Sequence, residues 1–275
     1  MRSMLANIAL GVILGAAALM PAQAQQDFSK VEIKTIKLSD TLYMLTGEGG
    51  NIGVSAGADG VYLIDDQYAP LSEKIMAALK AISDKPVKYV INTHWHGDHT
   101  GGNENFGKAG AAIIAHEAVR ARMAKGGELA AFKMAVAPAT AGALPVITFD
   151  DMIALHQNGE TARVIHVDPA HTDGDAIIHW PSANVIHTGD TFVNGVFPFV
   201  DTSSGGRLDG IIKSADMVLA LADDKTKIIP GHGPLATVED LKRYQQTIID
   251  TVALVEKGMM AGKTLEQLKK DGLPE

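Results

Sequence analysis

The sequence predicts an α/β fold in which two sheets pack face to face and helices cover their outer faces. Three observations lead to this prediction. Short strand-like segments are followed by helix-like ones, and this order occurs twice along the chain. The chain has 275 residues, 46% hydrophobic and 20% charged, which is enough apolar surface for a large core. Two similar halves of this kind indicate one domain with internal pseudo-symmetry.

The first half begins with strands and continues into helices. Val31–Leu38 alternates apolar and polar residues, which is typical of a half-buried strand, and Leu71–Ile82 has apolar residues at helical spacing. Further strands are predicted at Leu42–Leu45, Ile52–Ser55, Val61–Ile64, Val87–Ile91 and Ala111–Ala115, and a second helix at His116–Lys125. Gly126–Leu144 is rich in Ala and Gly and has little pattern, so we expect a loop or lid there.

The second half repeats this organisation. A meander of strands is predicted at Met152–Leu155, Arg163–Val167, Ala176–Trp180 and Val185–His187. A helix at Leu208–Leu221, a strand at Lys227–Ile229 and a long amphipathic helix at Val238–Glu256 follow.

The N-terminus has the features of a secretion signal. Arg2 provides a positive start, Leu5–Met20 is apolar, and Pro21 precedes small residues at the two cleavage-determining positions, Ala22 and Ala24. The apolar run is shorter than the roughly 20 residues that a membrane span needs, which disfavours the alternative of a membrane anchor. We therefore expect residues 1–24 to be a cleaved signal peptide and residues 25–275 to be a single domain. The product would be periplasmic or secreted, without stable membrane insertion.

Composition excludes several function classes. The chain has 24 Lys and Arg against 32 Asp and Glu, and a net charge of −8 disfavours a protein that binds nucleic acid through its phosphates. There is no cysteine, so disulfides, thiolate nucleophiles and iron–sulfur clusters are excluded. A metal site would have to use His, Asp and Glu, and ten histidines are present.

The strongest signal is the run of four possible metal ligands that follows the strand at Val87–Ile91. In an extended segment His94 and His96 project to the same side, and Gly97 allows a sharp turn that brings Asp98 and His99 back. Four ligands in six residues are too many for one tetrahedral zinc with an open position, and they suit two metals that share a pocket. The alternative, a surface cluster of histidines, fits a strand end poorly.

Three further candidates also follow apolar strands, where loops commonly assemble active sites. They are His171, Asp190 and His232, each with small or rigid neighbours such as Pro230-Gly231. The remaining histidines, His116, His156, His166, His179 and His187, need no ligand role.

These motifs, in this order, resemble the metallo-β-lactamase-fold hydrolases over nearly the whole predicted mature chain. The resemblance implies a four-layer αβ/βα sandwich with two metals at one edge of the sheets. It implies that His94, His96 and His171 hold a first zinc, that Asp98, His99 and His232 hold a second, and that Asp190 lies between or beside them. It also implies that Asp65 accepts a hydrogen bond that orients the histidine loop and is not a ligand.

Departures from the family pattern concern the substrate. The commonest lactamase subclass has Cys at the position of Asp190, a residue other than histidine at that of His99, and a carboxylate-binding Lys where this chain has Val193. Asp190 instead resembles the thioesterase, lactonase and phosphodiesterase branches of the family.

The expected activity is that of an exported zinc-dependent hydrolase with two Zn²⁺ ions. A hydroxide shared by the metals would attack the carbonyl of a small-molecule substrate, and Asp98 would orient this nucleophile. The leading substrate class is a β-lactam, hydrolysed weakly. The alternatives are a lactonase or thioesterase of the glyoxalase II type, and a periplasmic metal-binding accessory protein. Iron is the alternative metal, and the sequence does not indicate an oligomeric state.

Overall fold

The computed structural model describes residues 27–272. Residues from Val31 onward form one compact unit, and residues 27–30 belong to a separate N-terminal unit that ends in a turn. The signal peptide predicted at residues 1–24 lies outside the described residues, so the signal peptide and its boundary at residue 25 stay predictions.

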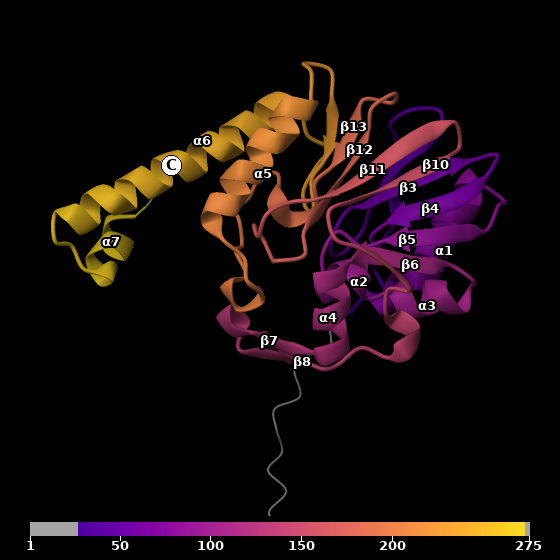
Figure 1. Cartoon of the computed structure of the whole chain (residues 1–275), viewed down its shortest axis with the longest axis horizontal. Coiled ribbons are helices and arrows are strands. Elements are labelled where there is room, and N and C mark those ends of the chain that lie inside the picture. The colour runs from indigo at the N-terminus through magenta and orange to yellow at the C-terminus, as the bar shows by residue number, and fades with distance from the viewer. Residues whose placement is uncertain (1–26, 273–275) are drawn as a thin grey trace, which may run out of the picture. The chain divides into compact units, whose positions relative to one another are not determined.

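The first sheet has seven strands in the order β1-β2-β3-β4-β5-β6-β9 (Figure 1). Pairing is antiparallel from β1 to β4 and parallel from β4 through β5 and β6 to β9. The strands are β1 (Lys34–Lys37), β2 (Leu42–Thr46), β3 (Ile52–Gly57), β4 (Gly60–Ile64), β5 (Val87–Ile91), β6 (Ala112–His116) and β9 (Ile147–Phe149). The parallel strands β4, β5 and β6 therefore end at the same edge of the sheet.

The second sheet has five strands in the order β10-β11-β12-β13-β14, and only its last pair is parallel. The strands are β10 (Met152–Gln157), β11 (Glu160–His166), β12 (Ala176–Trp180), β13 (Val185–His187) and β14 (Lys227–Ile229). The meander predicted from sequence is confirmed, and each of its strands lies within a few residues of the expected range.

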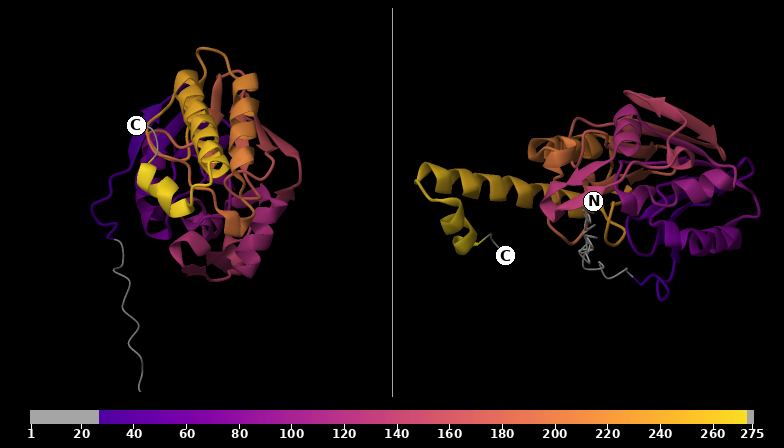
Figure 2. Two further views of the ribbon diagram at one scale, coloured as in Figure 1. Left: turned by 90° about the vertical axis from the view of Figure 1, so that its left-hand side faces the viewer. Right: turned by 90° about the horizontal axis from the view of Figure 1, so that it is seen from below.

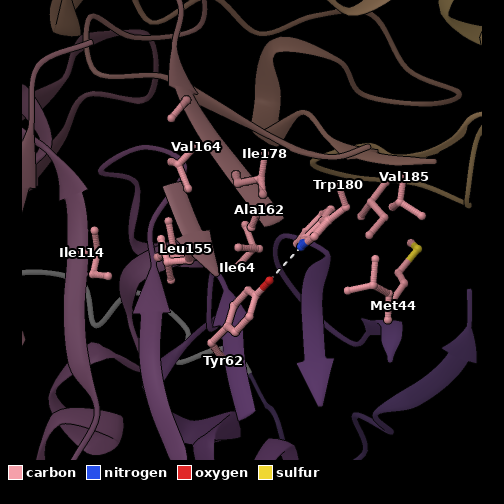
Figure 3. Close-up of a cluster of buried hydrophobic side chains, with 14 of the residues drawn as sticks. Met44, Tyr62, Ile64, Ile114, Leu155, Ala162, Val164, Ile178, Trp180 and Val185 are labelled. Carbon is pink, nitrogen blue, oxygen red and sulfur yellow. Dashed lines mark hydrogen bonds between the residues drawn. The ribbon is translucent and has the colours of Figure 1, made fainter. Parts of the chain in front are cut away.

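A hydrophobic core joins the inner faces of the two sheets (Figure 3). Ile64 and Met44 come from the first sheet, and Val164 and Ile178 come from the second; all four are fully buried. Within this core the indole Nε1 of Trp180 donates a hydrogen bond of 2.8 Å to the hydroxyl of Tyr62, on the facing sheet. Both large side chains thus satisfy their polar atoms while burying their rings.

Helices cover the outer faces, which completes the predicted four-layer α/β sandwich. α1 (Ser72–Ile82), α3 (Asn103–Lys108) and α4 (Glu117–Lys125) accompany the first sheet (Figure 1). On the second sheet, α5 (Leu208–Leu221) and α6 (Val238–Met260) lie side by side (Figure 2), and Ile211, Val218 and Leu241 pack against the sheet residues Ile177 and Ile186. The apolar stripes predicted from helical spacing are the faces that make these contacts.

Two expectations about secondary structure were wrong. The strand predicted at Val31–Leu38 is shorter, Lys34–Lys37, and all four of its residues are exposed, because it is an edge strand that pairs only with β2. The segment Gly126–Leu144 is not a plain loop. It contains the hairpin of β7 (Gly127–Leu129) and β8 (Met134–Val136), with strands too short to give a recognisable alternation.

Four elements had no counterpart among the predictions. They are α2 (Gly97–Thr100), α3, β9 and α7 (Leu265–Asp271). The two helices α2 and α3 have fewer than two turns, and the strand β9 has three residues. Elements this short show no recognisable periodicity of apolar residues. No residue of α7 is fully buried and only Leu268 is partly buried, so no apolar stripe marks the helix, although Thr264 and Gln267 form a capping box at its start.

Candidate metal centre

The histidine loop is positioned by the end of β5. The chain leaves the sheet after Ile91, and His96 then precedes the single-turn helix α2, which carries Asp98 and His99 in its first turn. His94, His96 and His99 are buried, while Asp98 is partly exposed. The structure thus brings the side chains of this loop into groups with closely spaced donor atoms.

The other predicted ligands come from the second sheet. His171 follows β11, Asp190 follows β13 and His232 follows β14. All three join the histidine loop, so the site is built from the strand ends of both sheets. Among the described residues, the groups that can hold a metal ion are His94 with His96 and His171, Asp98 with His99 and His232, and His94 with His99 and Asp190. The first two groups are the ligand sets that the resemblance implied.

Asp190 lies between the two groups. Its carboxylate is 3.6 Å from His171 Nε2 and 4.0 Å from His94 Nε2 on one side. On the other side it is 3.2 Å from His99 Nε2 and 3.4 Å from His232 Nε2. The carboxylate thus faces members of both groups, which agrees with the bridging position expected for this residue.

Asp65 fixes the tautomers of two candidate ligands. Its Oδ2 accepts hydrogen bonds from His99 Nδ1 at 2.8 Å and from the hydroxyl of Thr93 at 2.7 Å. Because the Thr93 proton points at Asp65, the Thr93 oxygen accepts the bond of 3.0 Å to His94 Nδ1. The Nε2 atom of His94 is then free of the proton and has no hydrogen-bond partner, while the Nε2 atom of His99 faces Asp190. Asp65 therefore contacts the candidate ligands from outside the centre, the position that the resemblance implied.

Asp65 is fully buried and has a backbone φ of 63°. This left-handed conformation is uncommon outside glycine and occurs where surrounding structure requires it, often at functional sites.

Two further groups orient the other ring ligands, and sequence analysis missed both. Asp201 Oδ2 accepts a hydrogen bond of 3.0 Å from His96 Nε2, and the carbonyl oxygen of Phe199 accepts one of 2.7 Å from His171 Nδ1. Asp201 also accepts bonds from the hydroxyl of Ser204, which in turn accepts the indole N–H of Trp95 at 3.0 Å. The segment from Phe199 to Ser204 thus holds two of the three rings in the first group.

The donor atoms of the first group fit a cation. With their outer nitrogens protonated, the neutral rings of His96 and His171 present lone pairs to each other, Nδ1 to Nε2, at 2.9 Å. His94 Nε2 is buried and has no hydrogen-bond partner. Burial lowers the pKa of His171 to about 4 and that of His94 well below its usual range, which keeps both rings neutral. Converging lone pairs of this kind repel one another unless a positive ion lies among them.

The second group is electrostatically different. Burial disfavours a charged His99 ring, but Asp190, Asp98 and Asp65 together raise its pKa well above the usual value. Burial likewise opposes charge on His232, whose hydrogen bonds to Asp190 and Asp98 raise its pKa to about 9. Two carboxylates therefore attract positive charge to this side of the centre, and a divalent cation satisfies the same attraction.

Close backbone approach makes two glycines necessary. A Cβ atom on Gly231 would lie 1.9 Å from Asp190 Oδ1, and one on Gly50 would lie 2.1 Å from His99 Cε1. Between them, the Asn51 amide donates hydrogen bonds of 2.8 Å and 2.9 Å to the carbonyl oxygens of Pro230 and Gly233. Asn51 therefore fastens the loop that carries His232, a role that no local sequence pattern indicated.

The five histidines set aside from sequence analysis lie outside the groups that can hold a metal. His187 is buried, and its Nε2 lies 3.1 Å from the carbonyl oxygen of Asn51. His116 caps the start of α4 by accepting a hydrogen bond of 3.2 Å from the Ala118 amide.

A cavity of about 390 Å³ opens onto the centre. Its floor includes Asp98, His171, Asp190 and His232, and its walls include Phe197 and Phe199. Both phenylalanines follow Asp190 closely in the sequence. Trp95, which stands between two candidate ligands in the sequence, packs instead with Val119 and Met123.

Comparison with known proteins agrees with this architecture. A hydroxyacylglutathione hydrolase from Pelagibacter ubique is 26% identical over 158 residues, which are 56% of this chain and 56% of the relative. A linear primary-alkylsulfatase from a Pseudomonas species is 23% identical over 255 residues, covering 77% of this chain and 48% of the relative. The chain thus spans about half the length of these curated relatives.

A solved metallo-beta-lactamase from Pontibacter korlensis shares the fold. It superposes with a TM-score of 0.65 and 18% identity, covering 80% of this chain and all of that one. The family model of the metallo-beta-lactamase superfamily matches residues 45–232, well over half of the chain and all the predicted ligands. The chain therefore belongs to the metallo-beta-lactamase superfamily.

Proposed function

We propose that this protein is a zinc-dependent hydrolase with two metal ions that cleaves a carbonyl substrate. The observation that supports the proposal most directly is the convergence of unprotonated ring nitrogens from His94, His96 and His171 beside the carboxylate of Asp190. Membership of the superfamily and the similarity to a hydroxyacylglutathione hydrolase support the same reaction type.

In this proposal His94, His96 and His171 hold the first ion, Asp98, His99 and His232 hold the second, and Asp190 lies between them. Nitrogen and carboxylate ligands suit zinc, and iron is the alternative metal for the same set. Two such ions supply Lewis acidity and an ionised water at neutral pH.

The protein's own groups complete the reaction. Asp98 lines the cavity, and its Oδ2 lies 3.2 Å from His232 Nε2. In the proposed reaction Asp98 orients the attacking water and takes its proton. The water oxygen bonds to the carbonyl carbon, the C–N, C–O or C–S bond breaks, and the proton passes to the leaving atom. No serine or cysteine nucleophile is needed, and the chain contains no cysteine.

Two substrate classes follow from this chemistry. Weak β-lactam hydrolysis is the first. Ester, lactone or thioester hydrolysis is the second, and two residues favour it: Asp190 where the commonest lactamase subclass has Cys, and Val193 where that subclass has a carboxylate-binding Lys. Val193 is uncharged and is buried in the cavity wall, so it cannot bind a substrate carboxylate as that Lys does.

The deciding experiment incubates the zinc-loaded protein with a chromogenic cephalosporin, a lactone and a glutathione thioester. We expect turnover of at least one substrate well above that of free zinc, and a loss of at least 100-fold in Asp98→Asn. Asp224→Asn serves as the matched control, because it changes an exposed carboxylate that is not part of the metal-binding groups or the cavity lining. Two bound zinc ions without any turnover would favour the alternative of a periplasmic metal-binding accessory protein.

We also propose that the protein is exported, to the periplasm or the outside of the cell. The support is the sequence of residues 1–24. In the described part of the chain, no helix has the length and apolar character that crossing a bilayer requires. Mass spectrometry of the protein recovered from a periplasmic fraction should show a chain that starts at Gln25. A chain that keeps Met1 would contradict export with cleavage.

A further inference from the structure

One wall of the cavity is apolar. It is formed by the hairpin β7–β8 with its turn and by the loop that follows Phe192. The side chains that these two segments contribute are Leu129, Phe132, Met134, Val196, Phe197 and Phe199. Phe132 is 63% exposed and Phe197 is 48% exposed. Large apolar side chains gathered at the mouth of a cavity are characteristic of ligand sites.

The hairpin is anchored at its base and exposed at its tip. Leu129 packs with Trp95 and Met123 beneath the hairpin, and the Ala130 amide donates a hydrogen bond of 3.2 Å to the Ser203 hydroxyl. At the tip, Phe132 meets Phe199 with a distance of 4.9 Å between ring centroids. The tip is thus held over the cavity by the same segment that orients the candidate ligands.

Aromatic contacts lead from the ligands to this tip. Phe199 stacks on His96 with ring centroids 6.2 Å apart and contacts His171 at 5.7 Å. A group that lies along Phe199 and Phe132 therefore has one end at the metal centre and the other at the mouth of the cavity.

Among the described residues, the apolar wall of the cavity contains no Lys or Arg. The Asp and His side chains that line the cavity all belong to the candidate metal centre, and they are His96, Asp98, His171, Asp190 and His232. Two cations border the region from outside. Lys133 is exposed at the tip of the hairpin, and Arg243 lines the adjacent hollow, where its guanidinium is bonded to Asp240.

We infer that the cavity selects substrates whose reactive carbonyl carries an uncharged apolar group of several carbon atoms. This inference rests on the proposed function and narrows it. A neutral ester or lactone with an alkyl or aryl group places that group against Phe132, Phe197 and Phe199. A substrate with a second carboxylate, as in a β-lactam antibiotic or a glutathione thioester, would have to place that carboxylate against the apolar wall, where no Lys or Arg of the described residues pairs with it.

The test measures kcat/KM of the zinc-loaded protein on 4-nitrophenyl acetate, butanoate and hexanoate. We expect an increase of about fourfold for each methylene that enters the cavity, the factor expected for burying one methylene group. Mono-4-nitrophenyl adipate has the same chain length as the hexanoate but ends in a carboxylate. It should react at least tenfold more slowly than the hexanoate. Equal rates along the series, or a preference for the adipate, would overturn the inference.

Variants assign the effect to the hairpin and the loop. The double substitution Phe132→Ser with Phe197→Ser should remove most of the dependence on chain length, and both side chains are exposed enough for the fold to persist. Two controls should retain the wild-type dependence. Leu265→Ser changes an equally exposed side chain on α7, and Lys133→Ala tests whether the neighbouring cation contributes. A double variant that is folded by circular dichroism and keeps the full dependence would also overturn the inference.

A second measurement does not require turnover. Saturation-transfer NMR on the metal-free protein should detect binding of 1-hexanol, weaker binding of hexanoate, and loss of both signals in the double variant. Binding of hexanol without hydrolysis of any ester would remove the proposed function and leave the apolar site. Ester hydrolysis without dependence on chain length, together with no hexanol binding, would remove the apolar site and leave the hydrolase.

Discussion

Asp201 accepts a hydrogen bond from His96 although the two residues lie 105 positions apart in the chain. A carboxylate on the outer nitrogen of a ligand ring fixes the tautomer and strengthens the ring as a donor. Despite its burial, hydrogen bonds from His96, Ser203 and Ser204 lower the pKa of Asp201, so it is charged at neutral pH. Asp201 is therefore a positioning residue for the first group of candidate ligands, His94, His96 and His171.

Asp201→Asn should weaken zinc binding at one of the two sites by about 10- to 100-fold and leave the other site nearly unchanged. Competition with a chromophoric chelator measures both affinities. Nitrogen-15 NMR of the histidine rings should show the His96 proton on Nε2 in the wild type and a changed tautomer balance in the variant. Asp224→Asn is the matched control, and unchanged zinc affinities in Asp201→Asn would contradict the assigned role.

Gly231 leaves room for the carboxylate of Asp190, a candidate metal ligand. The methyl group of Gly231→Ala would lie 1.9 Å from Asp190 Oδ1 and 2.6 Å from the Gly189 backbone, so both must move. We expect fewer than two zinc ions per chain, measured by elemental analysis, and at least 100-fold lower hydrolysis. Gly142→Ala is the control, since its methyl group would meet only the Glu104 side chain at an ordinary 3.5 Å. Full zinc occupancy in Gly231→Ala would refute the argument.

At the scale of elements, ligands that follow a strand were predictable and partners from distant loops were not. His94 to His99, His171, Asp190 and His232 each stand beside a recognisable strand end, and the resemblance to a known family completed the set. Asp201 and the Phe199 carbonyl follow no strand, and their function depends on a loop whose path is set by tertiary packing. The hairpin β7–β8 was missed for a similar reason: its three-residue strands are stabilised by packing beneath Leu129, which has no signature in the local sequence.

The junction between β6 and α4 carries a pH-sensitive contact. The ring of His116 stacks on His166 with centroids 3.8 Å apart. Burial, and then the neighbouring His166, lower the pKa of His116, although Asp150 and Asp173 oppose the shift. Because the folded-state pKa lies below the unfolded value, the folded state binds fewer protons. The resulting stability is present above the unfolded pKa of about 6.5 and is lost as the pH falls.

The free energy of unfolding of the metal-free protein should therefore fall more steeply between pH 7.5 and pH 5 in the wild type than in His116→Asn. Asparagine can still cap the start of α4, so the variant removes the titration and keeps the helix. Urea unfolding at the two pH values gives the comparison. Equal pH dependence in the two proteins would show that the stacked pair does not contribute.

At the scale of the whole molecule, the centre joins the strand ends of the two sheets. Without cations, Asp98 and Asp190 approach the same space, and the ring nitrogens of the first group repel one another. Metal ions that bind only the folded chain stabilise it by about 4 kcal/mol at a free concentration 1,000 times the dissociation constant. Each ion should then raise the melting temperature by about 10 °C.

Thermal unfolding with excess zinc and with a chelator measures this difference. A shift of one or two degrees would mean that the folded chain gains little from the metals. Replacing both His94 and His171 by Ala should remove the part of the shift that the first ion contributes, whereas replacing the exposed His156 should leave the shift unchanged.

The two tryptophans of the chain lie in different surroundings. Trp180 lies in the middle of the core, bonded to Tyr62, so its environment changes only when the sheets separate. Trp95 sits in the histidine loop and is linked through Ser204 and Asp201 to the ring of His96. Its fluorescence therefore responds to occupancy of the neighbouring ligands. In Trp180→Phe, emission from Trp95 would follow cation uptake. In Trp95→Phe, emission from Trp180 would follow denaturation. Neither measurement needs an added dye.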